Sequence, residues 1–302
     1  MTTTRQTQSY LRNLFEERGL HLKAKLGQNF LVDLNLLDVL VEAAELTRND
    51  LVLEIGTGTG SLTTRLAALA GAVLGIELDL PFFELTREAT AGLANVFLLH
   101  GDVLKGKNEI NPRVFGCLAD VKRRTNCDSP AAPCPLKLVA NLPFAAATPV
   151  IANLLLSDEC FERMVVTVQW EIAERLAAAP GSKDYGALSV LVQSVADVEI
   201  LRRLPPSVFW PRPQVASAFV LVKPNAAKRA HVGDVARFRS FLRDLYVHRR
   251  KNLRGALAGA PSGRRSKEDV DRRLAKLGID VSLRAETLDV EQHLRLCAAF
   301  CE

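Results

Sequence analysis

A glycine-rich turn between an apolar strand and a helix is the feature that most restricts the fold of this chain. Residues 51–55 predict a buried strand, residues 56–60 read Gly-Thr-Gly-Thr-Gly, and residues 61–69 predict a helix. Glycines at such a turn let the backbone approach a ligand closely, at the end of a helix whose first N–H groups are unpaired. We therefore expect a cofactor cradle in which Gly56 and Gly58 lie against the ligand.

Strands and helices alternate along the chain, which predicts an α/β fold with a doubly wound, mostly parallel sheet. The other expected strands are residues 72–76, 96–99, 136–140, 163–169, 195–201 and 218–222. Glu77 and Asp102 follow two of these strands, at the edge where open α/β sheets bind ligands. We expect the Glu77 carboxylate to accept bonds from ribose hydroxyls and the Asp102 carboxylate to meet an adenine amino group. Each acid alone is more often a solvated strand end, but the ordered set of motifs makes that explanation much less plausible for the two together.

Two cofactors fit a Gly-x-Gly-x-Gly turn that is followed by an acidic residue. The dinucleotide fingerprint requires glycine at its sixth position, where this chain has Ser61. The turn itself suits a nicotinamide dinucleotide and S-adenosylmethionine alike. The segment Asn-Leu-Pro-Phe at residues 141–144 favours S-adenosylmethionine.

That tetrapeptide ends an expected strand and carries the groups that methylation of an adenine amine needs. The N6 lone pair is delocalised into the purine ring, so the nitrogen is a poor nucleophile. The Asn141 side chain and the Leu142 carbonyl can hold the amine hydrogens and favour a more pyramidal nitrogen. Pro143 restricts the backbone around that carbonyl, and Phe144 offers a face on which a base can stack. Taken alone, the tetrapeptide is also typical of a plain turn.

The charge is divided unevenly along the chain. Residues 1–200 hold 18 Lys and Arg against 24 Asp and Glu, whereas residues 201–302 hold 21 against 10. A basic appendage on a mildly acidic core predicts a nucleic acid partner, because cationic side chains neutralise phosphates. Many of the cations fall on an expected helix at residues 234–257, and the predicted RNA contacts among them are Arg249, Arg250, Lys251 and Arg254. For any single arginine, a merely solvated basic surface is the alternative.

Two negative features bound the class of protein. No run approaches the ~20 apolar residues of a membrane span, and residues 1–18 lack the apolar centre of a signal peptide. No pair among the six cysteines has the two-residue spacing of common zinc sites. We therefore expect a cytoplasmic protein with reduced thiols and no metal.

The patterns divide the chain into regions. Residues 1–22 are expected to form a lead-in, residues 23–223 the cofactor domain and residues 234–302 a helical domain, after a linker at 223–233. Residues 105–135 are rich in charge, proline and cysteine, and we expect a surface insertion with little periodic structure. Helices are expected at residues 34–46, 171–179, 234–257, 266–277 and 290–300.

From about Leu26 to its end, the chain resembles the ribosomal RNA small-subunit (16S) adenine N6,N6-dimethyltransferase family. The matching segments are residues 26–31, 54–63, 141–144 with 148–149, 185–190, 205–209, 249–253, 277–280 and 284–286. Many families share the methyl-transfer core. The ordered matches through the C-terminal region make this resemblance specific.

The resemblance implies a Rossmann-like class I methyltransferase sheet with a small C-terminal helical domain. It implies a substrate of two adjacent adenines in a hairpin loop near the 3′ end of small-subunit rRNA, within the small ribosomal subunit. Each adenine would become N6,N6-dimethyladenine, with S-adenosylmethionine as the methyl donor. The implied roles are closure over the cofactor by Asn29 and Leu31, cofactor contacts by Gly56, Glu77, Asp102 and Asn141, orientation of the target amine by Asn141, and stacking of the base between Phe144 and Phe209. We expect a monomer.

The sequence departs from the family at several positions. Phe144 stands where tyrosine is usual, and Thr57 where proline is usual. Gln214 and Ala216 replace a frequent lysine and a frequent aspartate. Stacking survives at residue 144, so we expect activity. Three alternatives stay open: a large-subunit rRNA adenine methyltransferase, which the intact segment 277–286 disfavours, a non-catalytic RNA-binding assembly factor, and a DNA adenine methyltransferase.

Overall fold

The computed structural model of the protein describes all residues except 1–6, 24–25, 107–108, 128–133, 262 and 302. The chain forms two compact units. Met1–Ala173 and Glu199–Lys223 form the first, which we call the sheet unit, and Glu174–Val198 and Pro224–Glu302 form the second, which we call the helical unit. Residues 174–198, which the sequence analysis placed with the cofactor domain, therefore group with the C-terminal helices.

A seven-stranded sheet forms the centre of the sheet unit, in the order β4-β3-β2-β5-β6-β9-β7. Its strands are β2 (Leu51–Ile55), β3 (Ala72–Glu77), β4 (Val96–His100), β5 (Leu136–Asn141), β6 (Phe161–Gln169), β7 (Ala196–Leu204) and β9 (Ser217–Pro224). The strands from β4 to β6 pair in parallel, and β9 runs antiparallel to β6. Each strand coincides with a predicted one to within a few residues, and the predicted α/β fold is confirmed.

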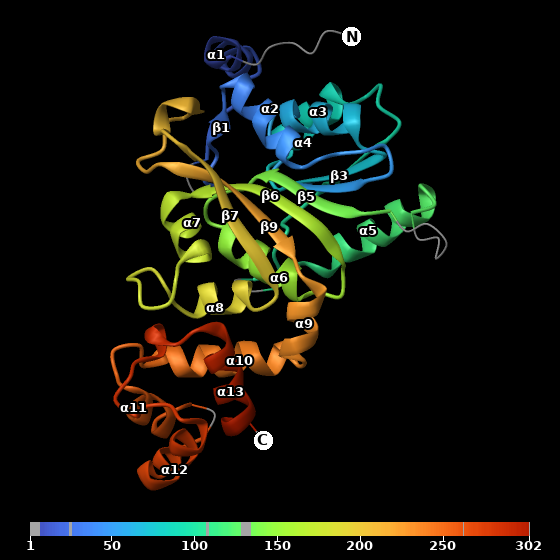
Figure 1. The fold of residues 1–302 in the computed structure, drawn as a ribbon. Helices are drawn as coiled ribbons and strands as arrows, with labels where there is room; N and C mark the ends of the chain where they lie inside the picture. Colours follow the sequence, from blue (N-terminus) through green and yellow to red (C-terminus); the bar gives the residue numbers. More distant parts are fainter. Residues whose placement is uncertain (1–6, 24–25, 107–108, 128–133, 262, 302) are drawn as a thin grey trace. The chain divides into compact units, whose positions relative to one another are not determined.

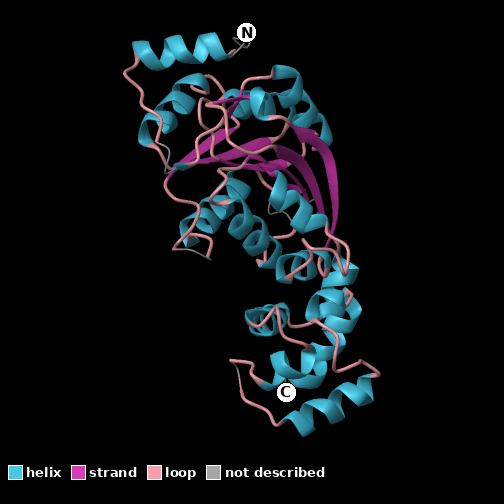
Figure 2. Ribbon diagram, turned by 90° about the vertical axis from the view of Figure 1, so that its left-hand side faces the viewer, coloured by secondary structure: helices cyan, strands magenta, loops and turns pink. Residues whose placement is uncertain are grey.

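Helices cover both faces of this sheet (Figure 1). One face carries α2 (Leu34–Ala43), α3 (Ser61–Leu69) and α4 (Leu80–Ala89), and the other carries α5 (Pro112–Arg124) and α6 (Ala147–Leu156). The turned view in Figure 2 shows the sheet between the two helical layers. All residues of β2 are buried, which explains why a continuous apolar run formed this strand.

Helix α5 lies inside the segment that we expected to be a non-periodic insertion. Val114, Leu118 and Val121 are buried along one side of α5, a helical spacing that the surrounding charges obscured. The helix belongs to the connection between β4 and β5, as a doubly wound sheet requires. Cys127 and Cys134 form a disulfide, with their Cα atoms 4.8 Å apart, which corrects the expectation of reduced thiols for these two residues.

The N-terminal lead-in is also structured. Helix α1 (Gln8–Glu17) buries Leu11 and Phe15 against Phe82 of α4, with the Phe15 and Phe82 ring centres 5.4 Å apart. The two-residue strand β1 (Phe30–Leu31) then pairs with β8 (Phe209–Trp210), some 180 residues further along the chain. This pairing ties β1, which directly precedes α2, to the segment between β7 and β9.

The helical unit holds α8 (Ala187–Gln193), α9 (Ala226–Val232), α10 (Val235–Val247), α11 (Leu253–Ala258), α12 (Lys267–Leu277) and α13 (Val290–Phe300). Helix α7 (Trp170–Ala177) begins in the sheet unit and ends in the helical unit, and short 3₁₀ turns occur at Pro206–Val208 and Ala285–Thr287. The expected linker at 223–233 contains α9, and the single helix expected at 234–257 is two helices. The break is set by Asn252, whose side chain accepts from the Gly255 N–H and starts α11 anew. No helix among the described residues has the length and apolarity needed to cross a membrane.

Candidate functional site

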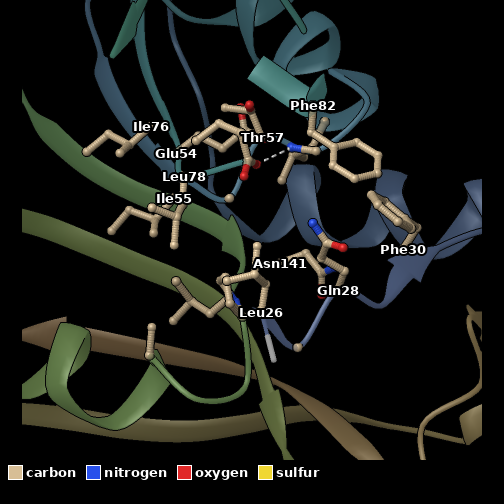
Figure 3. Close-up of a pocket in the computed structure, with 18 of the residues that line it drawn as sticks. Leu26, Gln28, Phe30, Glu54, Ile55, Thr57, Ile76, Leu78, Phe82 and Asn141 are labelled. Carbon is tan, nitrogen blue, oxygen red and sulfur yellow. Dashed lines mark hydrogen bonds between the residues drawn. The ribbon is translucent and has the colours of Figure 1, made fainter. Parts of the chain in front are cut away.

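A cavity of about 310 Å³ opens at the carboxyl ends of β2, β3, β4 and β5, where ligands bind in open α/β sheets. Its walls come from the glycine-rich turn, from the ends of these strands and from the loop before β1 (Figure 3). Predicted residues that line it are Asn29, Leu31, Gly56, Gly58, Glu77, Asp102, Asn141, Leu142 and Pro143. The fold therefore brings together the residues predicted to bind a cofactor.

The glycine-rich turn requires glycine for two reasons. Gly56, Gly58 and Gly60 have φ of +80°, +56° and +76°, in the region that side chains disfavour. A Cβ at Gly58 would lie 2.9 Å from the ring of Phe30, which is closer than real carbon atoms approach. Gly60 has no side chain that could cap the first N–H groups of α3. The turn therefore presents backbone donors to the ligand cavity.

Glu77 ends β3 and is 8% exposed. Its carboxylate accepts from the N–H groups of Gly58 and Asp79, both at 2.9 Å. Burial raises the pKa of Glu77, while these two backbone donors lower it. The carboxylate is thereby fixed against the glycine-rich turn, at the edge of the cavity where a ribose can meet it. Asp102 lies after β4 and is exposed, with one oxygen bonded to the Leu104 N–H at 2.9 Å.

Asn141 is held in one orientation. Its Nδ2 donates to the backbone oxygen of Asn29 at 2.8 Å, which assigns Oδ1 to the other side of the amide. Among the described residues, no group donates to Oδ1. Asn141 lines the cavity, so its free acceptor is available to a ligand and makes no contact that stabilises the fold. The same bond ties the end of β5 to the loop that closes the cavity from the N-terminal side.

The loop before β1 is anchored by a network that the sequence analysis missed. Asp79 has a side chain that is 1% exposed, and it accepts from Lys23 Nζ at 2.7 Å and from Gln28 Nε2 at 2.9 Å. Gln28 also accepts from the Lys23 N–H. Because the Asp79 N–H donates to the Glu77 carboxylate, the loop and Glu77 share one hydrogen-bond network. The available signal was Gln28, which falls within the matching segment 26–31.

Glu54 is the second residue that sequence reasoning left out. It is 1% exposed within β2, lines the cavity, and its Oε2 has no partner among the described residues (Figure 3). Complete burial raises the pKa of Glu54 to about 8, and the nearby Glu77 carboxylate adds to the rise. An acid inside an otherwise apolar strand was the sequence signal. A buried carboxyl with one unpartnered oxygen at a cavity wall suits a cationic ligand.

The two predicted stacking aromatics do not line this cavity. Phe144 is half-buried, and its backbone N lies 3.5 Å from where a Cβ on Gly27 would stand. Phe209 is 3% exposed and packs in the apolar core with Leu31. The ring of Phe209 is covered in this structure, and a stacking role for either ring stays a prediction.

The four cations predicted to bind RNA fall into two kinds. Arg249 donates to the backbone oxygens of Lys183 and Tyr185 at 2.7 and 3.2 Å, and its Nε lies 3.6 Å from the Glu286 carboxylate. Arg254 donates to Asp271 at 2.5 Å. Both arginines therefore hold the helical unit together.

The other two predicted RNA contacts are free to act at the surface. Arg250 and Lys251 are exposed, and within the described part of the chain their side chains have no bonded partner. Their role in binding RNA stays a prediction.

Three matching segments of the sequence meet inside the helical unit. The segment 249–253 contacts 185–190 through Arg249 and Tyr185, and it contacts 284–286 through Arg249 and Glu286. Segment 284–286 in turn accepts from the Gly181 N–H through the Glu286 backbone oxygen. These motifs therefore have a structural reason to occur together.

Comparisons with known proteins show the family to which the chain is similar. The model of the family "Ribosomal RNA adenine dimethylase" matches residues 19–300. The chain is 37% identical to the ribosomal RNA small subunit methyltransferase A of Halothermothrix orenii, over 92% of this chain and 88% of the relative. It is 38% identical to the protein of the same description from Pelotomaculum thermopropionicum, over 97% of this chain and 96% of the relative.

Solved structures share the fold. A dimethyladenosine transferase from Plasmodium falciparum superposes with a TM-score of 0.67 at 23% identity, over 87% of this chain and 94% of that chain. The 23S rRNA methyltransferase ErmE superposes with a TM-score of 0.60 at 22% identity, over 90% of this chain and 100% of that chain. At these identities the likeness concerns the fold alone.

Proposed function

The chain belongs to the ribosomal RNA adenine dimethylase family, and we propose that it methylates two adjacent adenines near the 3′ end of small-subunit rRNA. The methyl donor is S-adenosylmethionine, as in that family. Each adenine receives two methyl groups on N6. The observation that carries the proposal is Asn141, whose amide is fixed by Asn29 and keeps a free acceptor at the cavity.

The residues of the cavity fit this cofactor. A Cβ on Gly58 would collide with the ring of Phe30, so this part of the turn can present only backbone to the cofactor. Glu77 offers carboxylate oxygens to a ribose, and Asp102 offers one to an adenine amine. Glu54 has a buried oxygen without a partner, which a cationic ligand would satisfy. S-adenosylmethionine supplies an activated methyl group on a sulfonium cation.

The protein has to position the target amine for an in-line attack, and positioning supplies most of the rate. The free Oδ1 of Asn141 and the Leu142 carbonyl accept the two amine hydrogens and favour a pyramidal nitrogen. No strong base is needed, because the nitrogen becomes acidic only as the new bond forms. For the second transfer one N–H remains for the two acceptors, and the site must leave room for the first methyl group.

The setting of the reaction is part of the proposal. The relatives are named for the small ribosomal subunit, and the C-terminal third carries a strong positive charge. We propose that the protein acts as a monomer in the cytoplasm, on the small ribosomal subunit. Arg250 and Lys251 are exposed cations of the helical unit that have no bonded partner among the described residues, and they can meet its phosphates.

The test is methyl transfer from labelled S-adenosylmethionine to small subunits that lack the modification, followed by nucleoside analysis. The proposal expects N6,N6-dimethyladenosine at two adjacent positions. Large subunits and double-stranded DNA serve as competing acceptors. Label on either of these instead, or tight subunit binding without any label, would overturn the proposal in favour of a sister methyltransferase or an assembly factor.

A further inference from the structure

Three arginines of the sheet unit are exposed and have no role in the site described above. Arg202 and Arg203 lie on β7, the last strand in the order of the sheet, and Arg212 lies in the loop between β8 and β9. Within the part of the chain that the structure describes, no acidic side chain pairs with any of the three. They belong to the basic C-terminal third by sequence but to the sheet unit by structure.

Arg203 is held flat by an aromatic ring. Its guanidinium carbon lies 4.5 Å from the centre of the Trp170 ring, in a cation–π contact. A stacked guanidinium keeps its N–H edge free, and that edge matches two phosphate oxygens at once. Because the contact already fixes the side chain, less rotational freedom is lost when an anion binds.

These residues lie at the catalytic end of the sheet. Asn141 pairs with Thr167 in the parallel ladder between β5 and β6, and Trp170 follows Thr167 by three residues. From strand spacing and rise, Asn141 and Trp170 are roughly 11 Å apart in a straight line. The Trp170 N–H donates to Ala216 at 2.9 Å, which places the loop that carries Arg212 at the same end.

The same loop connects to the cofactor cavity. Arg212 follows Trp210 by two residues, and Trp210 pairs with Phe30. Phe30 lines the cavity beside Gly58. The arginines therefore flank the site where the target base must enter.

One structural explanation competes with a binding role. Charged side chains on a terminal strand keep other chains from pairing with that edge. This explanation covers Arg202, but it does not cover Arg212, which lies in a loop. Nor does it account for the stacking of Arg203 on Trp170.

We propose that Arg202, Arg203 and Arg212 form a second RNA contact, which grips the phosphate backbone beside the target adenine. The partner is a single RNA strand within a few nucleotides of the flipped base. The inference rests on the proposed RNA substrate and adds a contact that belongs to the catalytic unit itself. Trp170 acts as the positioning residue for the Arg203 guanidinium.

The experiment compares two double variants of the full-length protein that remove equal charge. Arg202→Gln/Arg212→Gln removes two of the proposed contacts. Arg12→Gln/Arg124→Gln removes two exposed cations of the same unit that have no partner among the described residues. The probe is unmodified small-subunit RNA, and its dissociation constant is measured across a range of salt concentrations.

We expect the first double variant to bind RNA on the order of tenfold more weakly near physiological salt. The slope of log affinity against log salt should fall by about 2, because two phosphate contacts are lost. Affinity for S-adenosylmethionine should not change in either variant. Trp170→Leu should weaken RNA binding, and Trp170→Phe, which keeps a ring under Arg203, should restore it.

Two results would contradict the inference, and they differ from each other. If the wild type binds and methylates the RNA while both double variants behave alike, this contact is wrong and the proposed function stands. If the wild type shows no salt-dependent binding to small-subunit RNA, both the proposed function and this contact are wrong.

Discussion

Each of the two units buries a titratable group whose pKa is shifted far from its ordinary value, and these two groups, Glu54 and His293, have opposite pH behaviour. Glu54 of the sheet unit lies at a cavity wall, and burial raises its pKa to about 8. His293 of the helical unit lies in a packed core, and burial lowers its pKa to about 4. The oxygen of Glu54 lacks a partner, whereas His293 bonds to the Asp289 oxygen at 2.7 Å and to the Tyr246 hydroxyl at 3.2 Å.

This difference indicates that Glu54 has a role in ligand binding, whereas His293 stabilises the fold. Buried polar groups in proteins are normally satisfied, and an exception calls for an explanation. His293 has both ring nitrogens bonded, so it serves the packing of α13 against α10. Glu54 is unsatisfied at the place where a cationic cofactor is proposed to bind.

The largest effect is expected from a substitution in the glycine-rich turn of the sheet unit. Gly58→Ala introduces a Cβ at φ +56° and 2.9 Å from Phe30. We expect the affinity for S-adenosylmethionine to fall at least about tenfold, which corresponds to ~1.4 kcal/mol. Isothermal titration calorimetry measures this. Gly116→Ala on α5 is the matched control, because its Cβ meets no atom within 4 Å, and unchanged binding with slightly higher stability is expected.

Glu54→Gln tests the alkaline side of the comparison. The folded pKa is raised, so the folded state alone holds a proton between about 4.5 and about 8, and wild-type stability falls as pH rises through that window. One unit of pKa difference corresponds to about 1.4 kcal/mol. The variant should flatten this dependence in hydrogen exchange of β2 amides without cofactor. Equal pH dependence in the variant and the wild type would show that Glu54 does not titrate there.

His293→Gln tests the acidic side. The folded pKa is lowered, so the unfolded chain alone binds a proton between about 4 and 6.5, and the helical unit loses stability as pH falls through that window. An amide can still donate to Asp289 and accept from Tyr246, so the fold should survive. The protection factors of α13 amides, which correct for the intrinsic pH dependence of exchange, should become nearly independent of pH in this range. If the stability of the helical unit depended on acidic pH in the variant as in the wild type, another titrating group would be responsible.

The smallest effects separate the two kinds of arginine in the helical unit. Arg249→Ala removes two hydrogen bonds to backbone oxygens, and we expect a loss of about 1 kcal/mol in stability because the side chain is half exposed. Arg250→Ala should leave stability within about 0.5 kcal/mol. It should weaken RNA binding several-fold and lower the salt slope by about 1. Thermal unfolding measures the stability and salt titrations measure the RNA binding. Equal results for Arg249→Ala and Arg250→Ala would contradict the distinction between the two arginines.

The sequence predicted the parts of the molecule whose signals are local. Strand β2, the glycine-rich turn and helix α3 were placed at their bounds because an apolar run, three glycines and a helical pattern follow each other directly. Glu77, Asp102 and Asn141 were expected to meet because parallel strands end at one edge, and all three line the cavity.

What could not be predicted depends on contacts between distant segments. The sequence did not reveal that Arg249 donates to the backbone oxygens of Lys183 and Tyr185, and its role in binding RNA stays a prediction. The burial of Phe209 was not visible in the sequence, because it depends on the pairing of β8 with β1, and its stacking role stays a prediction. The periodicity of α5 was hidden by the charges on its exposed side.

The most direct test of the central claim is single-turnover methyl transfer by Asn141→Ala on unmodified small subunits. Asn153→Ala, which removes an amide that bonds within α6, is the control. We expect transfer by Asn141→Ala to slow by about 10²–10³-fold, by analogy with the loss of one fixed polar group at a reacting centre, while S-adenosylmethionine still binds. The control should transfer at the wild-type rate. Wild-type transfer by Asn141→Ala would contradict the claim that its free acceptor orients the target amine.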